Sequence, residues 1–377
     1  MKICKKCIQP DTRPDIYFNE DGICGACLWH EEKKKIDWKD REKQLSEIAE
    51  WAKKTTKSNY DCVIGVSGGK DSTKQAITTR DRLGLRCLLV NSEPEGITEI
   101  GRHNIENLKN LGFDVISIRP NPKIMKKLMV RDFYKYLNPI KITEYSLWSS
   151  AYIIADKFDI PLIIQGENAG LTLGISLSGL GKDYDALKVN EASTLASGWE
   201  EYLEVECTDK RDLYLFHYDR KKLQEKGIRA IWLGYFLREW SYGGNAEFSK
   251  KYGFQWRPPG TDPNSIGTYA LYAQLDSDLV QVNQMLKYIK FGFGQCMDHA
   301  CYDLRDSRIT RDEAIELVRK YDGKCAEHYI VEFCNYIGIT LEEFWRVANQ
   351  FRGPMWVKDE QGNWHNTYWD ILEKERH

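Results

Sequence analysis

Short apolar runs alternate with longer amphipathic stretches in the central part of the chain. The apolar runs have the length and composition of buried strands, and they cover residues 62–66, 86–90, 114–118, 162–165 and 230–233. Between them lie stretches as long as crossover helices, at residues 72–82, 98–111, 123–136 and 145–158. This alternation predicts an α/β fold with a doubly wound, mostly parallel five-stranded sheet.

The flanking segments have different patterns. Residues 38–57 are charged and periodic, which predicts a helix, whereas residues 243–267 are rich in Gly and Pro and predict a long loop excursion. Capping boxes at Thr310 to Glu313 and Thr340 to Glu343 then predict a helical tail. We therefore expect a zinc ribbon at 1–35 (its cysteines are described below), a linking helix at 36–59, a sheet domain at 60–242, and the excursion with the helical region at 243–377.

Composition limits the class of protein. The 377 residues are 42% hydrophobic, enough for a large core, and 54 basic residues balance 56 acidic ones to a formal charge of −2. This even mixture does not favour a nucleic-acid-binding surface. The start of the chain lacks an apolar signal core, and no run reaches the roughly 20 apolar residues of a membrane helix. We expect a soluble, cytoplasmic protein without membrane insertion or a nucleic-acid partner.

A glycine-containing turn follows the first predicted strand and leads into a helix. Its residues are Ser67, Gly68, Gly69, Lys70, Asp71 and Ser72. Backbone N–H groups of such a turn, joined to a helix N-terminus, bind phosphate oxygens. The serines add hydroxyl donors, Lys70 adds a mobile positive charge, and Asp71 offers a carboxylate for Mg²⁺. A Walker loop is excluded because Asp71, rather than Ser or Thr, follows the lysine.

Two Cys-x-x-Cys pairs lie within the first thirty residues. Cys4 and Cys7 form one pair and Cys24 and Cys27 the other, a spacing typical of a structural zinc site with four thiolates. Four sulfur ligands leave no open position for water, so we expect a structural rather than a catalytic zinc. Cys296 and Cys301 flank His299, and the sequence leaves their roles open.

The turn matches Ser-Gly-Gly-x-Asp-Ser, the PP-loop of the ATP pyrophosphatase superfamily, whose members split ATP between the α and β phosphates. From Cys4 to about Tyr321, the chain resembles the N-acetyl sugar amidotransferase family of the WbpG/PseA type. The residues that carry this resemblance are the zinc ribbon, the PP-loop, Gln165-Gly-Glu-Asn168, Lys290-Phe-Gly-Phe-Gly-Gln-Cys-Met-Asp-His299 and Thr310-Arg-Asp-Glu-Ala314. The sequence departs from the family pattern at Gln295-Cys-Met, where an arginine and small residues are expected.

The resemblance implies an ATP-dependent enzyme of bacterial surface-glycan synthesis, either of lipopolysaccharide or of flagellin sugars. It would adenylate an acetamido oxygen of a nucleotide-activated sugar and replace that oxygen with ammonia, giving an acetamidino group. By position, Glu167 and Asn168 would face the α-phosphate and the acceptor. Lys290, Asp298 and His299 would meet phosphate, Mg²⁺ or sugar, and Arg305 and Arg308 are candidates to bind a diphosphate or uronate.

Ammonia would have to come from a partner protein. Lys2 occupies the second position, so there is no N-terminal cysteine nucleophile, and outside the two cysteine pairs no Gly-x-Cys elbow with a downstream His-x-Glu is present. The resemblance implies a separate glutaminase with a cyclase-like subunit that forms an ammonia channel, both resembling imidazole glycerol phosphate synthase.

Two alternatives stay open. A tRNA-thiolating enzyme can also join a zinc ribbon to a PP-loop, but residues 120–165 lack the cysteines usual in that class, and no basic stripe is present. A non-catalytic scaffold could use the ribbon and the tail to recruit partners while the loop senses nucleotide. Intact Lys70 and Asp71 argue against that second alternative.

Overall fold

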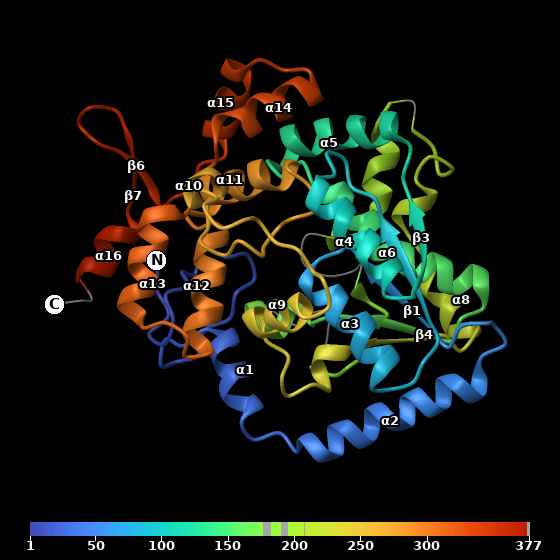
Figure 1. Cartoon of the computed structure of the whole chain (residues 1–377). Coiled ribbons are helices and arrows are strands. Elements are labelled where there is room, and N and C mark those ends of the chain that lie inside the picture. The colour runs from blue at the N-terminus through green and yellow to red at the C-terminus, as the bar shows by residue number, and fades with distance from the viewer. Residues whose placement is uncertain (176–181, 190–194, 207, 375–377) are drawn as a thin grey trace.

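A five-stranded parallel sheet forms the centre of the protein (Figure 1). The computed structural model describes residues 1–175, 182–189, 195–206 and 208–374. The strands are β1 (Cys62–Val66), β2 (Cys87–Ser92), β3 (Asp114–Ile118), β4 (Leu162–Gln165) and β5 (Arg229–Trp232), in the order β3-β2-β1-β4-β5. Every neighbouring pair is parallel, which confirms the predicted fold class.

Helices cover both faces of this sheet, because successive strand residues point to opposite faces. One face packs against α2 (Trp38–Thr55), α3 (Lys70–Asp81) and α4 (Glu99–Asn110). The other face packs against α6 (Lys141–Phe158) and α8 (Arg220–Glu225). The remaining elements around the sheet are α5 (Pro122–Tyr136), α7 (Ala169–Leu173) and the 3₁₀ turns Trp199–Glu204, Tyr214–Phe216 and Leu233–Tyr235.

The C-terminal region is helical, as predicted. Its helices are α11 (Leu279–Phe291), α12 (Gln295–Arg305), α13 (Arg311–Tyr321), α14 (Glu327–Ile337), α15 (Leu341–Gln350) and α16 (Tyr368–Lys374). Thr310 forms the expected reciprocal capping box with Glu313. Thr340 accepts from the Glu343 N–H, while the Glu343 carboxylate pairs with Arg346. An antiparallel hairpin of β6 (Trp356–Lys358) and β7 (Trp364–Asn366) interrupts the tail and was not predicted.

The prediction of a loop throughout residues 243–267 is wrong. Helix α9 (Tyr242–Lys250) begins one residue before this segment and occupies its first part, and a short α10 (Pro263–Ile266) follows. Gly243 and Gly244 lie in the first turn of α9, where the Ser241 hydroxyl caps the helix by accepting from the Gly244 N–H. A Cβ at Gly243 would lie 2.1 Å from the Arg308 guanidinium, so this glycine permits close packing between α9 and the start of the α12–α13 connection.

The N-terminal segment packs on the C-terminal helices rather than on the sheet. The four cysteines of the two pairs share one hydrophobic cluster with α12, α13 and α16. The Tyr368 hydroxyl donates to the Ile8 carbonyl at 2.8 Å, and the Thr12 hydroxyl donates to the Phe291 carbonyl at 2.6 Å. Figure 1 shows the N-terminus beside α13, from where α1 (Gly25–Lys33) leads towards α2.

Within the described part of the chain, no helix has both the length and the apolar character needed to cross a membrane.

Candidate functional site

The glycine turn lies at the carboxyl end of the central strand. β1 ends at Val66 and α3 begins at Lys70, so Ser67, Gly68 and Gly69 form the connection. Gly68 has φ +74°, and an added Cβ would also lie 3.1 Å from the Asn104 Cβ, so glycine is required at this position. The free N–H groups at the start of α3 make this turn a suitable anion site. The Ser72 hydroxyl donates to the Gly69 carbonyl at 3.1 Å and thereby braces the turn.

Lys70 and Asp71 are held by residues of α9. The Lys70 ammonium donates to the Asp71 carboxylate at 2.5 Å and lies 3.5 Å from the centre of the Tyr242 ring. The other Asp71 oxygen accepts from the Asn245 amide at 2.7 Å, and the Asn245 oxygen accepts from Lys74 at 2.8 Å. This chain of bonds fixes the direction of the Asp71 carboxylate, which is one-third exposed and could hold Mg²⁺ together with phosphate oxygens.

His299 forms hydrogen bonds with Tyr242, the residue whose ring contacts Lys70. Its Nε2 lies 2.9 Å from the Tyr242 hydroxyl, and its Nδ1 lies 2.6 Å from the Thr268 hydroxyl. Burial lowers the pKa of His299 to about 3, so the ring is neutral near pH 7. Because both ring nitrogens of His299 are within hydrogen-bonding distance of a hydroxyl group, the imidazole is held in place. It thereby orients the Tyr242 ring against the Lys70 ammonium.

Glu167 and Asn168 follow β4, at the same edge of the sheet as the turn. Burial raises the pKa of Glu167, and the nearby Asp71 carboxylate adds to this effect. The Trp240 indole N–H donates to Glu167 at 3.3 Å. The Asn168 side chain accepts from the Gly170 N–H at 2.9 Å and caps α7, so part of its role is structural.

Glu167 borders two cavities of different size. The smaller, about 70 Å³, lies between α1, α12 and the segment before α9, and Lys33 and Arg305 are among its lining residues. Arg305 stacks on Tyr302, with the guanidinium carbon 5.0 Å from the ring centre. Arg308 lies instead in a neighbouring cavity and faces Asp303 at 4.0 Å.

The larger cavity has a volume of about 580 Å³ and reaches from Glu167 to α11. Lys290 lines it and donates to the Tyr136 carbonyl at 2.6 Å. Asp298 has other partners, since it forms ion pairs with Arg13 and Lys287. Burial opposes ionisation of Asp298, but Arg13 and Lys287 outweigh it and lower its pKa to about 2. Lys290, Asp298 and His299 therefore have separate partners.

The four N-terminal cysteines form a compact buried cluster. Their sulfur atoms lie within 4.8 Å of one another, with Cys4 to Cys27 at 3.9 Å and Cys7 to Cys24 at 3.7 Å. A tetrahedral site with Zn–S bonds of about 2.3 Å has sulfur–sulfur edges of about 3.8 Å, so the cluster fits zinc. Backbone N–H groups of Cys7 and Cys24 donate to the Cys4 sulfur, which favours a thiolate there.

The two remaining cysteines of this region are buried in α12. Cys301 is buried in the same hydrophobic cluster as the four N-terminal cysteines. The Cys296 thiol faces the Leu317 carbonyl at 3.5 Å.

Three site residues were missed by the sequence reasoning: Trp240, Tyr242 and Asn245. They lie at or next to the segment that was predicted to be a loop. The sequence contains one usable signal, since Ser241 is a favoured N-cap residue directly before Tyr242. Nothing in the local sequence indicates that Asn245 contacts Asp71, 174 positions earlier.

One family model matches the C-terminal part of the chain. Residues 264–374 match the family described as "LPS biosynthesis protein WbpG-like, C-terminal domain". No curated protein matches the chain.

Two solved structures show a weak likeness. One is a predicted subunit of tRNA methyltransferase from Methanocaldococcus jannaschii, with 15% identity over 60% of this chain and 87% of that one, at a TM-score of 0.29. The other is NMN synthetase from Francisella tularensis, with 14% identity over 51% of this chain and 96% of that one, at a TM-score of 0.28. Likenesses at these scores support no inference. The matched segment contains Lys290, Asp298 and His299, so this part of the chain is similar to the C-terminal domain of WbpG-like proteins.

Proposed function

We propose that the protein is an ATP-dependent amidotransferase that converts an acetamido group of a nucleotide-activated sugar into an acetamidino group. The observation that carries the proposal is the Lys70–Asp71 pair, held by α9 at the start of α3, with Glu167 at the end of the neighbouring strand. The similarity of residues 264–374 to a WbpG-like domain supports a role in lipopolysaccharide synthesis, because the family description names that process. A flagellin sugar is an alternative acceptor within the same proposal.

The reaction would proceed in two steps. The acetamido oxygen attacks the α-phosphorus of ATP, and the bond to the β-phosphate breaks to release pyrophosphate. Ammonia then adds to the activated carbon, and AMP leaves with the former acetamido oxygen. Ser67, Gly68 and Gly69 would hold the departing pyrophosphate through backbone N–H groups, and Lys70 would balance its charge. Asn168 would keep the β4 loop in place beside the acceptor.

Two metals belong to this proposal. Cys4, Cys7, Cys24 and Cys27 would hold a structural zinc that orders the segment before α1, and α1 forms one wall of the small cavity. Asp71 would hold Mg²⁺, which screens the charge of the phosphates. The zinc contributes to folding, whereas Mg²⁺ acts only together with ATP.

Ammonia would reach the site from a separate glutaminase that acts through a cyclase-like channel subunit, with all three proteins in the cytoplasm. A tRNA-thiolating enzyme remains the second candidate from the sequence. No observation on the described site favours it over a sugar amidotransferase.

The test is to incubate the purified protein with Mg-ATP, ammonium chloride and a panel of UDP- and CMP-linked diacetamido sugars. AMP release together with an acetamidino product, identified by mass, would support the proposal. Replacing Asp71 with Asn should abolish both. AMP without a sugar product would redirect the search to sulfur acceptors and tRNA, and formation of ADP or no nucleotide turnover would contradict the proposal.

A further inference from the structure

The 580 Å³ cavity beside Glu167 combines features that the proposed reaction has not yet used. Its volume lies in the range of about 300–1,000 Å³ that is typical of small-molecule sites. Trp148 and Trp232 both line it, and their rings meet edge to face with centres 6.3 Å apart. Flat aromatic faces of this kind pack well against a nucleobase or a sugar ring.

Amide side chains line another part of the cavity. Asn138, Asn283 and Gln284 each carry a buried side-chain oxygen that accepts no hydrogen bond from the described residues. An unsatisfied buried acceptor is costly, so it calls for a donor. The terminal torsion of an amide is soft, and a small rotation would direct these oxygens to hydroxyl or N–H groups of a bound sugar.

A positive charge without an acidic partner lies at the same wall. Arg13 and Lys287 are both paired with Asp298. The Lys290 ammonium instead contacts two neutral groups, the Tyr136 carbonyl at 2.6 Å and the Phe291 ring with its centre at 4.8 Å, and forms no ion pair with a described carboxylate. Lys290 also lies near a second cation, because burial and the charge of Lys141 together lower its pKa. An ammonium in this setting is suited to an anionic group of a ligand.

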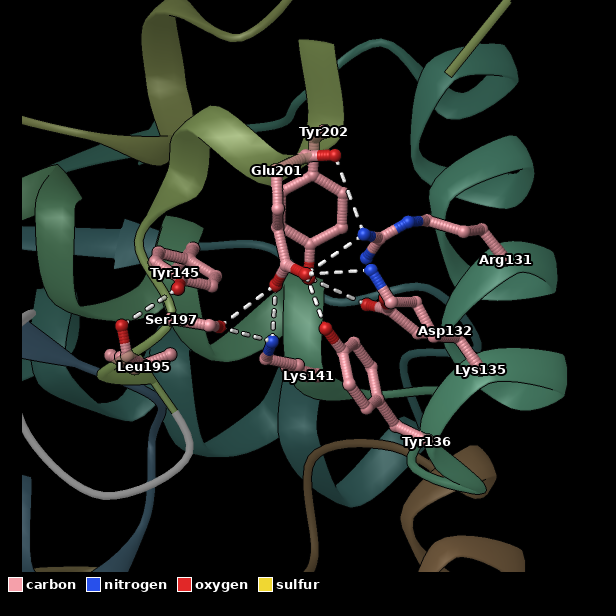
Figure 2. Close-up of polar contacts among 10 residues, drawn as sticks. All are labelled: Arg131, Asp132, Lys135, Tyr136, Lys141, Tyr145, Leu195, Ser197, Glu201 and Tyr202. Atoms are coloured by element: carbon pink, nitrogen blue, oxygen red, sulfur yellow. Dashed lines mark hydrogen bonds and ion pairs between the residues drawn. The ribbon is translucent and has the colours of Figure 1, made fainter. Parts of the chain in front are cut away.

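Tyr136, whose backbone carbonyl accepts the hydrogen bond from Lys290, is itself held by a network of polar side chains (Figure 2). The Tyr136 hydroxyl donates to Glu201, which also accepts from Lys141 and, at 2.8 Å, from Arg131. Figure 2 shows these groups converging on the Glu201 carboxylate from α5 and α6. The network therefore positions the Tyr136 carbonyl, and through it Lys290, at the cavity wall.

From these observations, and resting on the proposed function, we infer that the large cavity binds the acceptor as an anionic nucleotide-linked sugar, with Lys290 bound to its anionic group. The acetamido group would then point to Glu167, which borders this cavity and interacts electrostatically with the Asp71 carboxylate. In this arrangement, Lys290 determines which acceptors bind, and the ATP site at the glycine turn is separate from it.

The experiment measures binding without ATP, by calorimetry, to the intact protein. The probes are UDP-N-acetylglucosamine, free N-acetylglucosamine and N-acetylneuraminic acid, which separate a diphosphate from a carboxylate as the bound anion. The Lys290→Met variant should bind the anionic probe about tenfold to a hundredfold more weakly, as expected for loss of a charge-assisted hydrogen bond. Lys290→Arg should retain most of the affinity. Lys109→Met, which alters an exposed lysine on α4, is the matched control and should bind like the parent protein.

The outcomes distinguish this inference from the proposed function. Binding that depends on Lys290 would support the inference even if no AMP forms with ATP and ammonium. Equal binding by the parent protein and Lys290→Met, or failure of the parent protein to bind any of the three probes, would overturn it even if acetamidino product forms. Unchanged zinc content and thermal unfolding of Lys290→Met would show that a loss of affinity does not arise from misfolding.

Discussion

Asn245 gives the sharpest test of how the site is built. It is completely buried, and its amide joins the Asp71 carboxylate at 2.7 Å to the Lys74 ammonium at 2.8 Å. The Asn245→Leu substitution keeps a side chain of similar size and removes both of these bonds, together with a longer one from the Ser241 N–H at 3.4 Å. A hydrogen bond to a charged group contributes about 1.5–3 kcal/mol. Water can replace the bond to Asp71 in part, so we expect the free energy of unfolding to fall by about 2–4 kcal/mol.

The same change should weaken Mg²⁺ use. Asp71 would lose the partner that fixes its direction, and loss of such supporting bonds typically costs about tenfold to a hundredfold in metal affinity. The measurements are urea unfolding and AMP release as a function of Mg²⁺ concentration at saturating ATP. We expect a higher Mg²⁺ requirement in Asn245→Leu.

Asn366→Leu is the matched control for this experiment. Asn366 is also a buried asparagine with two hydrogen bonds, but its partners are the neutral backbone groups of Gly292 and Tyr368. It should lose about 1–3 kcal/mol of stability with no change in Mg²⁺ dependence. If Asn245→Leu behaves in the same way, with only stability affected, the assignment of Asn245 as a positioning residue for Asp71 is refuted.

Three further predictions concern other parts of the molecule. Replacing Cys24 and Cys27 together with Ser should lower the zinc content, measured by mass spectrometry of the metal, from one per chain to nearly none, whereas unchanged zinc would exclude the four-cysteine site. Burial lowers the pKa of Lys290 to about 8, so the affinity of the protein for UDP-N-acetylglucosamine should be constant below that pH and fall above it towards the affinity of Lys290→Met, while Lys290→Arg should show a flat profile. Burial opposes ionisation of Glu201, but Arg131 and Lys141 outweigh it and hold its pKa at about 2. The stabilisation from Glu201 should thus be complete above about pH 4.3 and disappear towards pH 2, so Glu201→Gln should be less stable than the parent protein at pH 7 and nearly equal to it at pH 2, by urea unfolding. An equal difference at both pH values would contradict this.

The sequence predicts the sheet well because its signals are local. The apolar runs at 62–66 and 114–118 coincide with β1 and β3, and α4 (Glu99–Asn110) lies within the predicted helical stretch 98–111. The glycine turn is equally local, since its residues are consecutive and lie at one strand–helix junction. These features need no knowledge of distant contacts.

The parts that were missed depend on contacts between distant segments. The glycines at 243 and 244 suggested a loop, whereas a serine cap and packing against Arg308 stabilise a helix there. Lys290 was grouped with Asp298 because both lie in one motif, yet its bond goes to Tyr136, 154 positions away. Neighbours in sequence thus face different partners, and only the folded chain shows which ones.

The most direct test of the proposed chemistry follows the acetamido oxygen. A diacetamido UDP-sugar labelled with ¹⁸O in both acetamido carbonyls is incubated with the protein, Mg-ATP and ammonium chloride, and AMP and the sugar product are analysed by mass spectrometry. We predict that AMP carries one ¹⁸O atom and that the acetamidino product retains one of its two, because the oxygen of the converted group departs with the α-phosphate. Unlabelled AMP, or ¹⁸O in ADP or inorganic phosphate, would contradict adenylation of the acetamido oxygen.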